Sequence, residues 1–339
     1  MRAVTAQAPG QISVEEVPDA ALPGPAGAVV RVEAAAICGS DLHFYDGDLP
    51  FYPVAVGHES IGTVTEIGAD VARFGVGDRV LVSSVAGCGA CAGCATLDPV
   101  ACTGGAKVFG SGELGGAQSD LLAVPAADFN LLRIPEGVSD EAALLLTDNL
   151  GTGWAAATRA DFEPGETVVV LGLGAVGQCA VRCAIALGAR VLAYDPVEGR
   201  RALAEAAGAT ALPDDVVPAV LEATGGRGAA AVIDAVGHNA TVDTAFAAVR
   251  STGTVSVVGI HDLEPYPLQL LMGTFRSITL RMTTAPVHRT WGELLPLIAD
   301  GRLDTTGIFT HTFDLDDAAE AYAAVASRSA DCLKVMLIP

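Results

Sequence analysis

Lysine is scarce in this sequence: Lys107 and Lys334 are the only two among 339 residues. Acidic side chains outnumber basic ones, and the formal net charge is −21. A surface this acidic repels phosphate backbones, so we expect no nucleic-acid partner. The excess of negative charge is typical of a solubilising surface.

Long apolar runs are also missing. A membrane-spanning helix needs about twenty apolar residues in a row, and no such run occurs, so we expect no membrane partner. The N-terminal stretch MRAVTAQAPGQISVEEVPD lacks the apolar core of a signal peptide. We therefore expect a cytoplasmic protein whose cysteines are thiols or metal ligands rather than disulfides.

Two kinds of pattern divide the chain near residue 150. Before it, runs such as GAVVRVEAAAIC alternate apolar and polar residues between glycines, which predicts antiparallel strands. From about 150 to 280, continuous apolar runs alternate with helix-like segments, which predicts a doubly wound α/β domain with a parallel sheet. Beyond it, TWGELLPLIADGRL and DDAAEAYAAVAS predict amphipathic helices, and CLKVMLI predicts a strand.

A nucleotide-binding pattern lies at the start of this second region. Gly172, Gly174 and Gly177 have G-x-G-x-x-G spacing between a predicted strand and a predicted helix. They allow a tight turn, the approach of a pyrophosphate and close packing of helix on strand. Asp195 ends the next predicted strand, where a carboxylate accepts hydrogen bonds from ribose hydroxyls and repels a 2′-phosphate. The pattern favours NAD over NADP.

Half of the eight cysteines fall within fifteen residues, in the spacing C-x2-C-x2-C-x7-C. Four thiolates on one segment can surround a single tetrahedral zinc ion, and such a closed site is structural. An iron–sulfur cluster is the alternative, although bacterial ferredoxins have a last gap of three residues followed by proline. We expect a structural zinc held by Cys88, Cys91, Cys94 and Cys102.

Four motifs together resemble the zinc-dependent medium-chain alcohol dehydrogenase family. They are ICGSDLH, GHESIGTVTEIG, the cysteine cluster and LGLGAVG, and they occur in the family's order. The resemblance implies a GroES-like, mainly antiparallel β catalytic domain and a Rossmann coenzyme domain. The implied boundaries are 1–149 for the catalytic domain, with its structural zinc lobe at about 87–103, and 150–280 for the coenzyme domain. Residues 281–339 would return to the catalytic domain.

The resemblance also implies a second, catalytic zinc, giving two zinc ions per chain. Cys38, His58 and Asp148 match the family's three protein ligands, which leave one position open for substrate. Glu59 resembles the carboxylate beside the ligand histidine, and Asp41 resembles the acid that orients that histidine.

Further roles follow from the same resemblance. Ser40 resembles the hydroxyl that takes the alcohol proton, and His43 resembles the base that relays it to solvent. The remaining residues implied to contact the coenzyme are Thr152, Ala175, Val176, Arg200, Val258, Gly259 and Ile260.

The expected function is oxidation of an alcohol or polyol to an aldehyde or ketone, with hydride transfer to NAD. A formaldehyde- or threonine-dehydrogenase-type enzyme is an alternative, and a non-catalytic nucleotide-binding or structural protein on the same scaffold is another. We expect a small-molecule substrate and a homodimer or homotetramer, in which an edge strand such as VSVVGI pairs across subunits. Four histidines follow no motif and are expected in loops or at the surface: His238, His261, His288 and His311.

Overall fold

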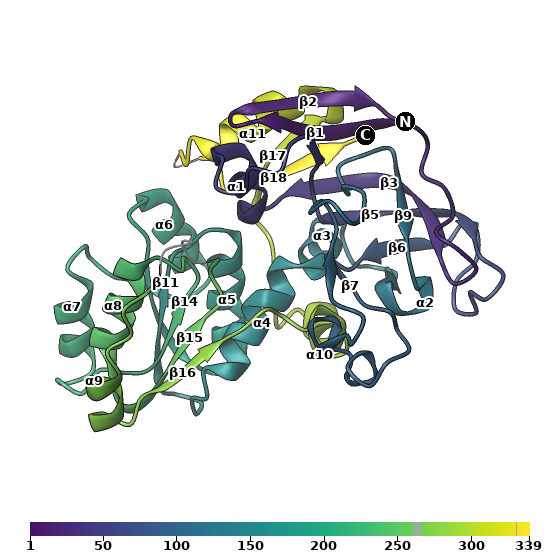
Figure 1. Cartoon of the computed structure of the whole chain (residues 1–339). Helices are drawn as coiled ribbons and strands as arrows, with labels where there is room; N and C mark the ends of the chain where they lie inside the picture. The colour runs from purple at the N-terminus through teal and green to yellow at the C-terminus, as the bar shows by residue number, and fades with distance from the viewer. Residues whose placement is uncertain (261–264, 330) are drawn as a thin grey trace. The chain divides into compact units, whose positions relative to one another are not determined.

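The computed structural model describes residues 1–260, 265–329 and 331–339; His261 lies outside them. The chain divides into two compact units (Figure 1). The first unit comprises residues 1–151, 286–299 and 308–339, and the second comprises 152–285 and 300–307. Over the described residues, no helix has both the length and the apolar character needed to cross a membrane.

The first unit is built mainly from antiparallel strands. Its largest sheet has the order β10-β6-β5-β3-β18-β17, with β9 also paired to β3, and only β17 and β18 run parallel in it. A smaller sheet has the order β2-β1-β4, and β7 pairs with β8. The strands are β1 (Arg2–Ala8), β2 (Gln11–Glu16), β3 (Ala28–Ile37), β4 (Val54–Ala55), β5 (Glu59–Ile67), β6 (Arg79–Val82), β7 (Val85–Ala86), β8 (Lys107–Val108), β9 (Leu121–Val124), β10 (Leu131–Arg133), β17 (Phe309–Asp314) and β18 (Lys334–Ile338).

Helices cover parts of these sheets. α11 contacts β2 and β18 (Figure 1), and α3 packs on β5 and β6. The apolar residues that face inward from β3, β6 and β9 form one core, and those from β1, α11 and β18 form another. The helices are α1 (Leu42–Asp46), α2 (Ala127–Asn130), α3 (Asp140–Thr147), α10 (Val287–Ala299) and α11 (Ala318–Ala326), and α4 (Asn149–Arg159) crosses the boundary between the units.

The second unit is a parallel sheet with helices on both faces. Its strand order is β13-β12-β11-β14-β15-β16. α5 packs on β11 and β12, whereas α8 packs on β14 and β15, so the sheet lies between them (Figure 1). All six residues of β14 are buried, as expected for a strand covered on both faces. The elements are β11 (Thr167–Leu171), α5 (Ala175–Ala186), β12 (Arg190–Tyr194), α6 (Glu198–Ala206), β13 (Thr210–Ala211), α7 (Val216–Ala223), β14 (Ala229–Asp234), α8 (Asn239–Ala248), β15 (Val249–Val257), α9 (Leu270–Phe275) and β16 (Thr279–Met282).

The predicted fold class is confirmed, and two details of the prediction are wrong. β15, which contains the first half of VSVVGI, pairs with β14 and β16, so it has no free edge for another subunit. His288 is buried on α10 rather than lying at the surface, because the rings of Phe129 and Trp291 pack against it.

Candidate metal centres and coenzyme site

The predicted ligands of the catalytic zinc lie at the ends of helices and strands that the fold brings together. Cys38 follows β3, His58 precedes β5, and β3 and β5 are antiparallel neighbours, so the end of one strand lies beside the start of the other. Asp148 interrupts the path from α3 to α4, with φ −154° and ψ −71°. This non-helical backbone separates the two helices at the residue whose side chain joins the cluster.

The ligand atoms of this group lie close enough to share one ion. One atom from each of Cys38, His58, Glu59 and Asp148 lies within 4.8 Å of the others. The Asp148 Oδ2 atom is 3.6 Å from the Cys38 Sγ atom and 3.5 Å from the His58 Nε2 atom. A thiol, an imidazole and a carboxylate are a donor set that zinc accepts. We call these residues the mixed cluster.

His58 has polar neighbours at both ring nitrogens. Asp41 Oδ1 lies 3.2 Å from His58 Nδ1, so Nε2 is the nitrogen that faces Asp148 and Ser40. Asp41 Oδ2 in turn accepts hydrogen bonds from the Cys38 N–H and the Gln118 amide. Such contacts fix the orientation of a ligand histidine and favour one tautomer. The sequence predicted the role of Asp41 by resemblance but gave no indication of Gln118.

A buried ion pair completes the surroundings of the mixed cluster. The Lys334 ammonium lies 2.6 Å from Glu59 Oε2, and both side chains are almost fully buried. Lys334 also donates to the Ile37 carbonyl, and Asn149 donates to Glu59 Oε1 at 2.9 Å. Sequence reasoning missed Lys334 and Asn149. One signal was available, because Lys334 is one of two lysines and lies in an otherwise apolar strand.

The electrostatics of this cluster favour a cation. Burial raises the pKa of Cys38, and the negative charge of Glu59 raises it further. Burial alone would lower the pKa of His58, but the charges of Asp41 and Cys38 raise it well above its usual range. A raised pKa disfavours a free nucleophilic thiolate at Cys38. The same anionic groups would stabilise a divalent ion.

The predicted proton relay is only partly assembled. The Ser40 hydroxyl lies 3.4 Å from His58 Nε2. His43, on α1, instead pairs with Asp48 at 2.9 Å and is partly exposed. In the described part of the chain, no hydrogen bond joins Ser40 to His43.

The four clustered cysteines lie together on a segment that contains only short 3-10 turns. Cys91 and Cys102 have their Sγ atoms 3.9 Å apart, and Cys88 and Cys94 have theirs 4.0 Å apart. Zinc–sulfur bonds of about 2.3 Å place tetrahedral sulfurs roughly 3.8 Å apart. An iron–sulfur cluster separates its cysteines more widely because several irons lie between them, so the spacing favours a single ion.

Backbone amides support the thiolate form of two cysteines of this cluster, Cys91 and Cys102. The N–H groups of Cys94 and Thr103 donate to the Cys91 sulfur and lower its pKa to about 5. The Cys88 N–H likewise lowers the pKa of Cys102, whereas burial raises that of Cys94 to about 12. Hydrogen bonds to ligand sulfurs are typical of structural metal sites.

The glycine-rich turn of the second unit has the geometry that a dinucleotide requires. A Cβ on Gly172 would lie 2.3 Å from Val236, and Gly172 has φ +82°. A Cβ on Gly177 would lie 1.9 Å from the Gly172 carbonyl oxygen, so the helix can approach the strand only with glycine there. A Cβ on Gly174 would meet nothing within 4 Å, which leaves open space beside the turn. Ala175 and Val176 begin α5 at the same place.

Asp195 lies beside this turn and is buried. Its Oδ2 atom accepts from the Leu173 N–H at 2.8 Å, and Oδ1 accepts from the Val197 N–H at 2.9 Å. The Arg200 guanidinium is 3.7 Å from Asp195, and its buried Nε has no hydrogen-bond partner in the described residues. Asp195 therefore organises the turn while retaining lone pairs for a ligand, and Arg200 has a donor that a ligand could satisfy.

A second buried carboxylate shapes the neighbouring loops and was missed in the sequence. Asp234 Oδ1 accepts from the N–H groups of Val236 and Gly237, and Oδ2 accepts from Thr241. The Asp234 carbonyl also accepts from the N–H groups of Val258 and Gly259, which follow β15, and Ile260 next to them is exposed. Thr152 lies on α4, within the second unit.

Two family models match the chain. The alcohol dehydrogenase GroES-like domain matches residues 24–136, and the zinc-binding dehydrogenase domain matches residues 175–300. The chain is 59% identical to the "Probable zinc-binding alcohol dehydrogenase" of Mycobacterium tuberculosis, covering 100% of this chain and 89% of that protein.

Solved structures are also similar. The alcohol dehydrogenase TADH from Thermus sp. ATN1 superposes with a TM-score of 0.94 at 34% identity, covering 100% of this chain and 99% of the other. An E. coli CFT073 alcohol dehydrogenase solved with the cofactor NADH superposes with a TM-score of 0.88 at 27% identity, with coverage of 100% and 99%.

Proposed function

The chain belongs to the zinc-dependent medium-chain alcohol dehydrogenase family, and we propose that it oxidises an alcohol or polyol reversibly to the aldehyde or ketone with NAD. The observation that supports this most directly is the mixed cluster, in which residues from distant segments place a thiol, an imidazole and carboxylates within 4.8 Å of one another.

We propose that Cys38, His58 and Asp148 hold one zinc ion and that the four clustered cysteines hold another. A zinc ion in the mixed cluster would act as a Lewis acid that lowers the pKa of the substrate hydroxyl. Asp41 keeps His58 oriented through its Nδ1 contact. Glu59, paired with Lys334 and Asn149, adds a fixed carboxylate beside the ligands.

The proposed proton path begins at Ser40, whose hydroxyl lies against the His58 ring. A hydroxyl can accept one proton while donating its own, so Ser40 can hold and pass on the substrate proton. His43 is partly exposed and paired with Asp48, so it can exchange protons with water. The contact that links Ser40 to His43 would have to come from a bound ligand.

NAD is the proposed coenzyme. Bound at the glycine turn, it would accept the hydride. Gly174 leaves space for its pyrophosphate, and the N-terminus of α5 presents a positive dipole end to those phosphates. Asp195 and Arg200 would contact the adenosine ribose, Thr152 the nicotinamide, and the loop at Val258–Ile260 the backbone side of the coenzyme.

We also propose a homodimer or homotetramer. β16 is an edge strand of the parallel sheet, and large apolar side chains are exposed on it and on α9 nearby, where a partner subunit would cover them. They are Leu270, Leu271, Met272, Phe275 and Met282. Light scattering of the purified protein tests this proposal.

The decisive experiment offers a panel of primary, secondary, polyol and amino alcohols with NAD or NADP while NADH or NADPH absorbance is followed. We expect turnover of at least one alcohol with a clear NAD preference, and about two zinc ions per chain by elemental analysis. A zinc-loaded protein that turns over none of the alcohols would contradict the proposed reaction. A clear NADP preference would contradict only the role given to Asp195.

A further inference from the structure

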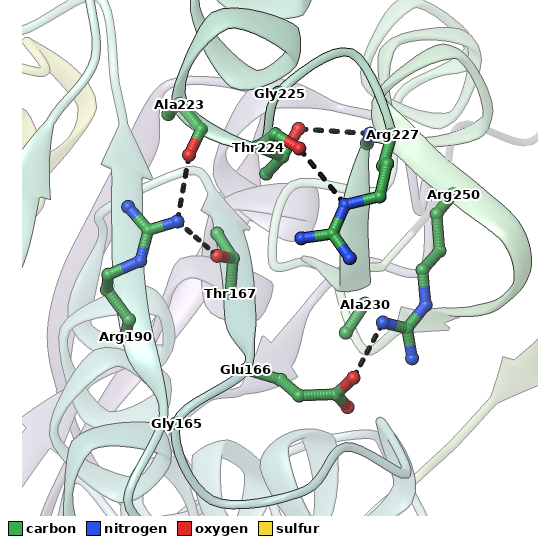
Figure 2. Close-up of a pocket in the computed structure, with 11 residues that line it drawn as sticks. Gly165, Glu166, Thr167, Arg190, Ala223, Thr224, Gly225, Arg227, Ala230 and Arg250 are labelled. Carbon is green, nitrogen blue, oxygen red and sulfur yellow. Dashed lines mark hydrogen bonds and ion pairs between the residues drawn. The ribbon is translucent and has the colours of Figure 1, made fainter.

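A cavity of about 570 Å³ opens at the edge of the second unit where the parallel strands begin. β11, β12, β14 and β15 all contribute from their first residues or the turns before them. The glycine turn follows the other end of β11, so this cavity is separate from the proposed coenzyme site. Its lining is Gly165, Glu166, Thr167, Arg190, Ala223, Thr224, Gly225, Arg227, Gly228, Ala230 and Arg250 (Figure 2).

Three arginines surround this cavity in a chain that is otherwise strongly acidic. Arg250 pairs with Glu166 at 2.6 Å. The Glu163 N–H and Arg250 lower the pKa of Glu166, so its carboxylate stays ionised. Within the described ranges, Arg190 and Arg227 form no ion pair with a carboxylate. The lining therefore carries an excess of two positive charges.

The two arginines without carboxylate partners keep most of their donors available. Arg190 uses one terminal nitrogen to contact the Thr167 hydroxyl and the Ala223 carbonyl. In the part of the chain that the structure describes, the Arg227 guanidinium donates only through Nε, to the Thr224 carbonyl at 3.3 Å. Figure 2 shows the Arg190 guanidinium on one side of the pocket and those of Arg227 and Arg250 on the other, with no dashed line from the terminal nitrogens of Arg227 to the residues drawn.

The rest of the lining leaves enough space for a small organic molecule as well as an ion. Glycine and alanine occupy five of the lining positions, and the cavity volume lies in the range of about 300–1,000 Å³ that is common for small-molecule sites. Planar guanidinium groups bind phosphate oxygens through two parallel hydrogen bonds. A phosphate monoester carries a charge of about −1.5 to −2 near pH 7, which matches the excess positive charge.

We propose that this cavity binds a small phosphate monoester, with Arg190 and Arg227 holding the phosphate and the glycine- and alanine-lined space holding the organic part. The site is independent of the alcohol reaction and of the coenzyme. Its ligand is expected to compete with simple salts, because the contacts are charge–charge interactions near the surface.

Calorimetric titration of the full-length protein in low-salt, phosphate-free buffer tests the proposal. Glucose 6-phosphate, inorganic phosphate and glucose are the three probes. We expect glucose 6-phosphate to bind and glucose not to bind. Arg227→Gln and Arg190→Gln should each weaken the binding about tenfold or more, since each removes a charge-assisted hydrogen bond.

Arg302→Gln is the matched control, because Arg302 belongs to the same unit, is exposed and pairs only locally with Asp300. It should leave binding unchanged, and saturating NADH should not displace glucose 6-phosphate. Three results would overturn the proposal: no binding of glucose 6-phosphate, equal binding by the wild type and both cavity variants, or displacement by NADH. Equal affinity for inorganic phosphate would overturn the monoester assignment in favour of the free ion. Thermal melts show whether Arg190→Gln remains folded. Arg227→Gln is the independent variant, because the only hydrogen bond of the Arg227 guanidinium in the described residues is to Thr224, three residues earlier in the same loop.

Discussion

The two groups of residues that could hold a metal are assembled in different ways. The four-cysteine cluster takes every ligand from residues 88–102 and is stabilised mainly by backbone N–H groups that point at sulfur. The mixed cluster takes ligands from the end of β3, the start of β5 and the break between α3 and α4. It is surrounded by side chains, including Lys334, which forms a buried ion pair with Glu59 of the cluster.

The four-cysteine cluster can form within one local loop, whereas the mixed cluster forms only when the first unit is folded. A ligand set within one segment can bind its ion as soon as that segment turns, so the ion contributes mainly to local stability. A set from distant segments exists only after the sheet has formed, and the fold then holds the groups at fixed positions for chemistry. We therefore expect loss of the two ions to affect different properties.

The largest expected effect is on turnover. His58→Ala should reduce the rate of alcohol oxidation at least about a thousandfold, because the zinc ion that His58 is proposed to hold would supply several kcal/mol of stabilisation to the reacting oxygen. The variant should lose about one zinc ion per chain and retain a melting temperature close to that of the wild type. Steady-state kinetics, elemental analysis and thermal melts measure these three quantities.

His311→Ala is the control for this variant, since His311 lies on β17 without any role in either cluster. It should keep both zinc ions and full turnover. A His58→Ala protein with unchanged zinc content would contradict the ligand role, whatever its activity.

The next effect is on stability. Cys94→Ser should remove the other zinc ion and lower the free energy of unfolding by about 3–5 kcal/mol, because a structural ion contributes directly to folding. Urea denaturation and elemental analysis measure the loss. Cys332→Ala, which changes a buried cysteine outside both clusters, should keep both ions. If Cys94→Ser abolished turnover without a loss of stability, the division of roles between the clusters would be wrong.

Lys334→Met should destabilise the fold by about 3 kcal/mol, because it leaves the Glu59 carboxylate buried without its partner. Adding Glu59→Gln should restore a large part of that loss, since the double variant leaves no unpaired charge at these two positions. Denaturation of the wild type, both single variants and the double variant gives the coupling energy. Additive losses would show that the pair is not coupled. The zinc of the cysteine cluster should remain bound throughout.

Some of these parts of the molecule could be predicted from the sequence and others could not, for physical reasons. The parallel sheet and the glycine turn follow from local patterns, and the four cysteines carry their spacing in one segment. Cys38, His58 and Asp148 were found only by resemblance, because no local pattern links residues so far apart in the chain. Lys334 and Gln118 were missed because each acts through a contact across the sheet rather than through a motif.

The smallest expected effect concerns a histidine beside the cysteine cluster. His288 lies 3.2 Å from Asn130 Oδ1, and Asn130 exchanges two hydrogen bonds with Gly87, next to Cys88. Phe129 stacks on the His288 ring at 4.2 Å. No sequence pattern indicates this contact, because α10 is far from Asn130 and Cys88 along the chain and packs near them only in the folded first unit.

Burial lowers the pKa of His288 to about 3, so the folded state keeps the ring neutral while the unfolded chain binds a proton below its ordinary pKa of about 6.5. The contribution of His288 to the free energy of unfolding is fully present above pH 6.5. It is lost as the pH falls toward 3, by up to about 1.4 kcal/mol for each pH unit. His288→Phe keeps a ring against Phe129 and removes this proton. Its free energy of unfolding should fall less steeply than that of the wild type between pH 6.5 and 4.5, as measured by urea denaturation at fixed zinc. If the free energies of unfolding of the two proteins fell in parallel with pH, the fold would not hold His288 neutral.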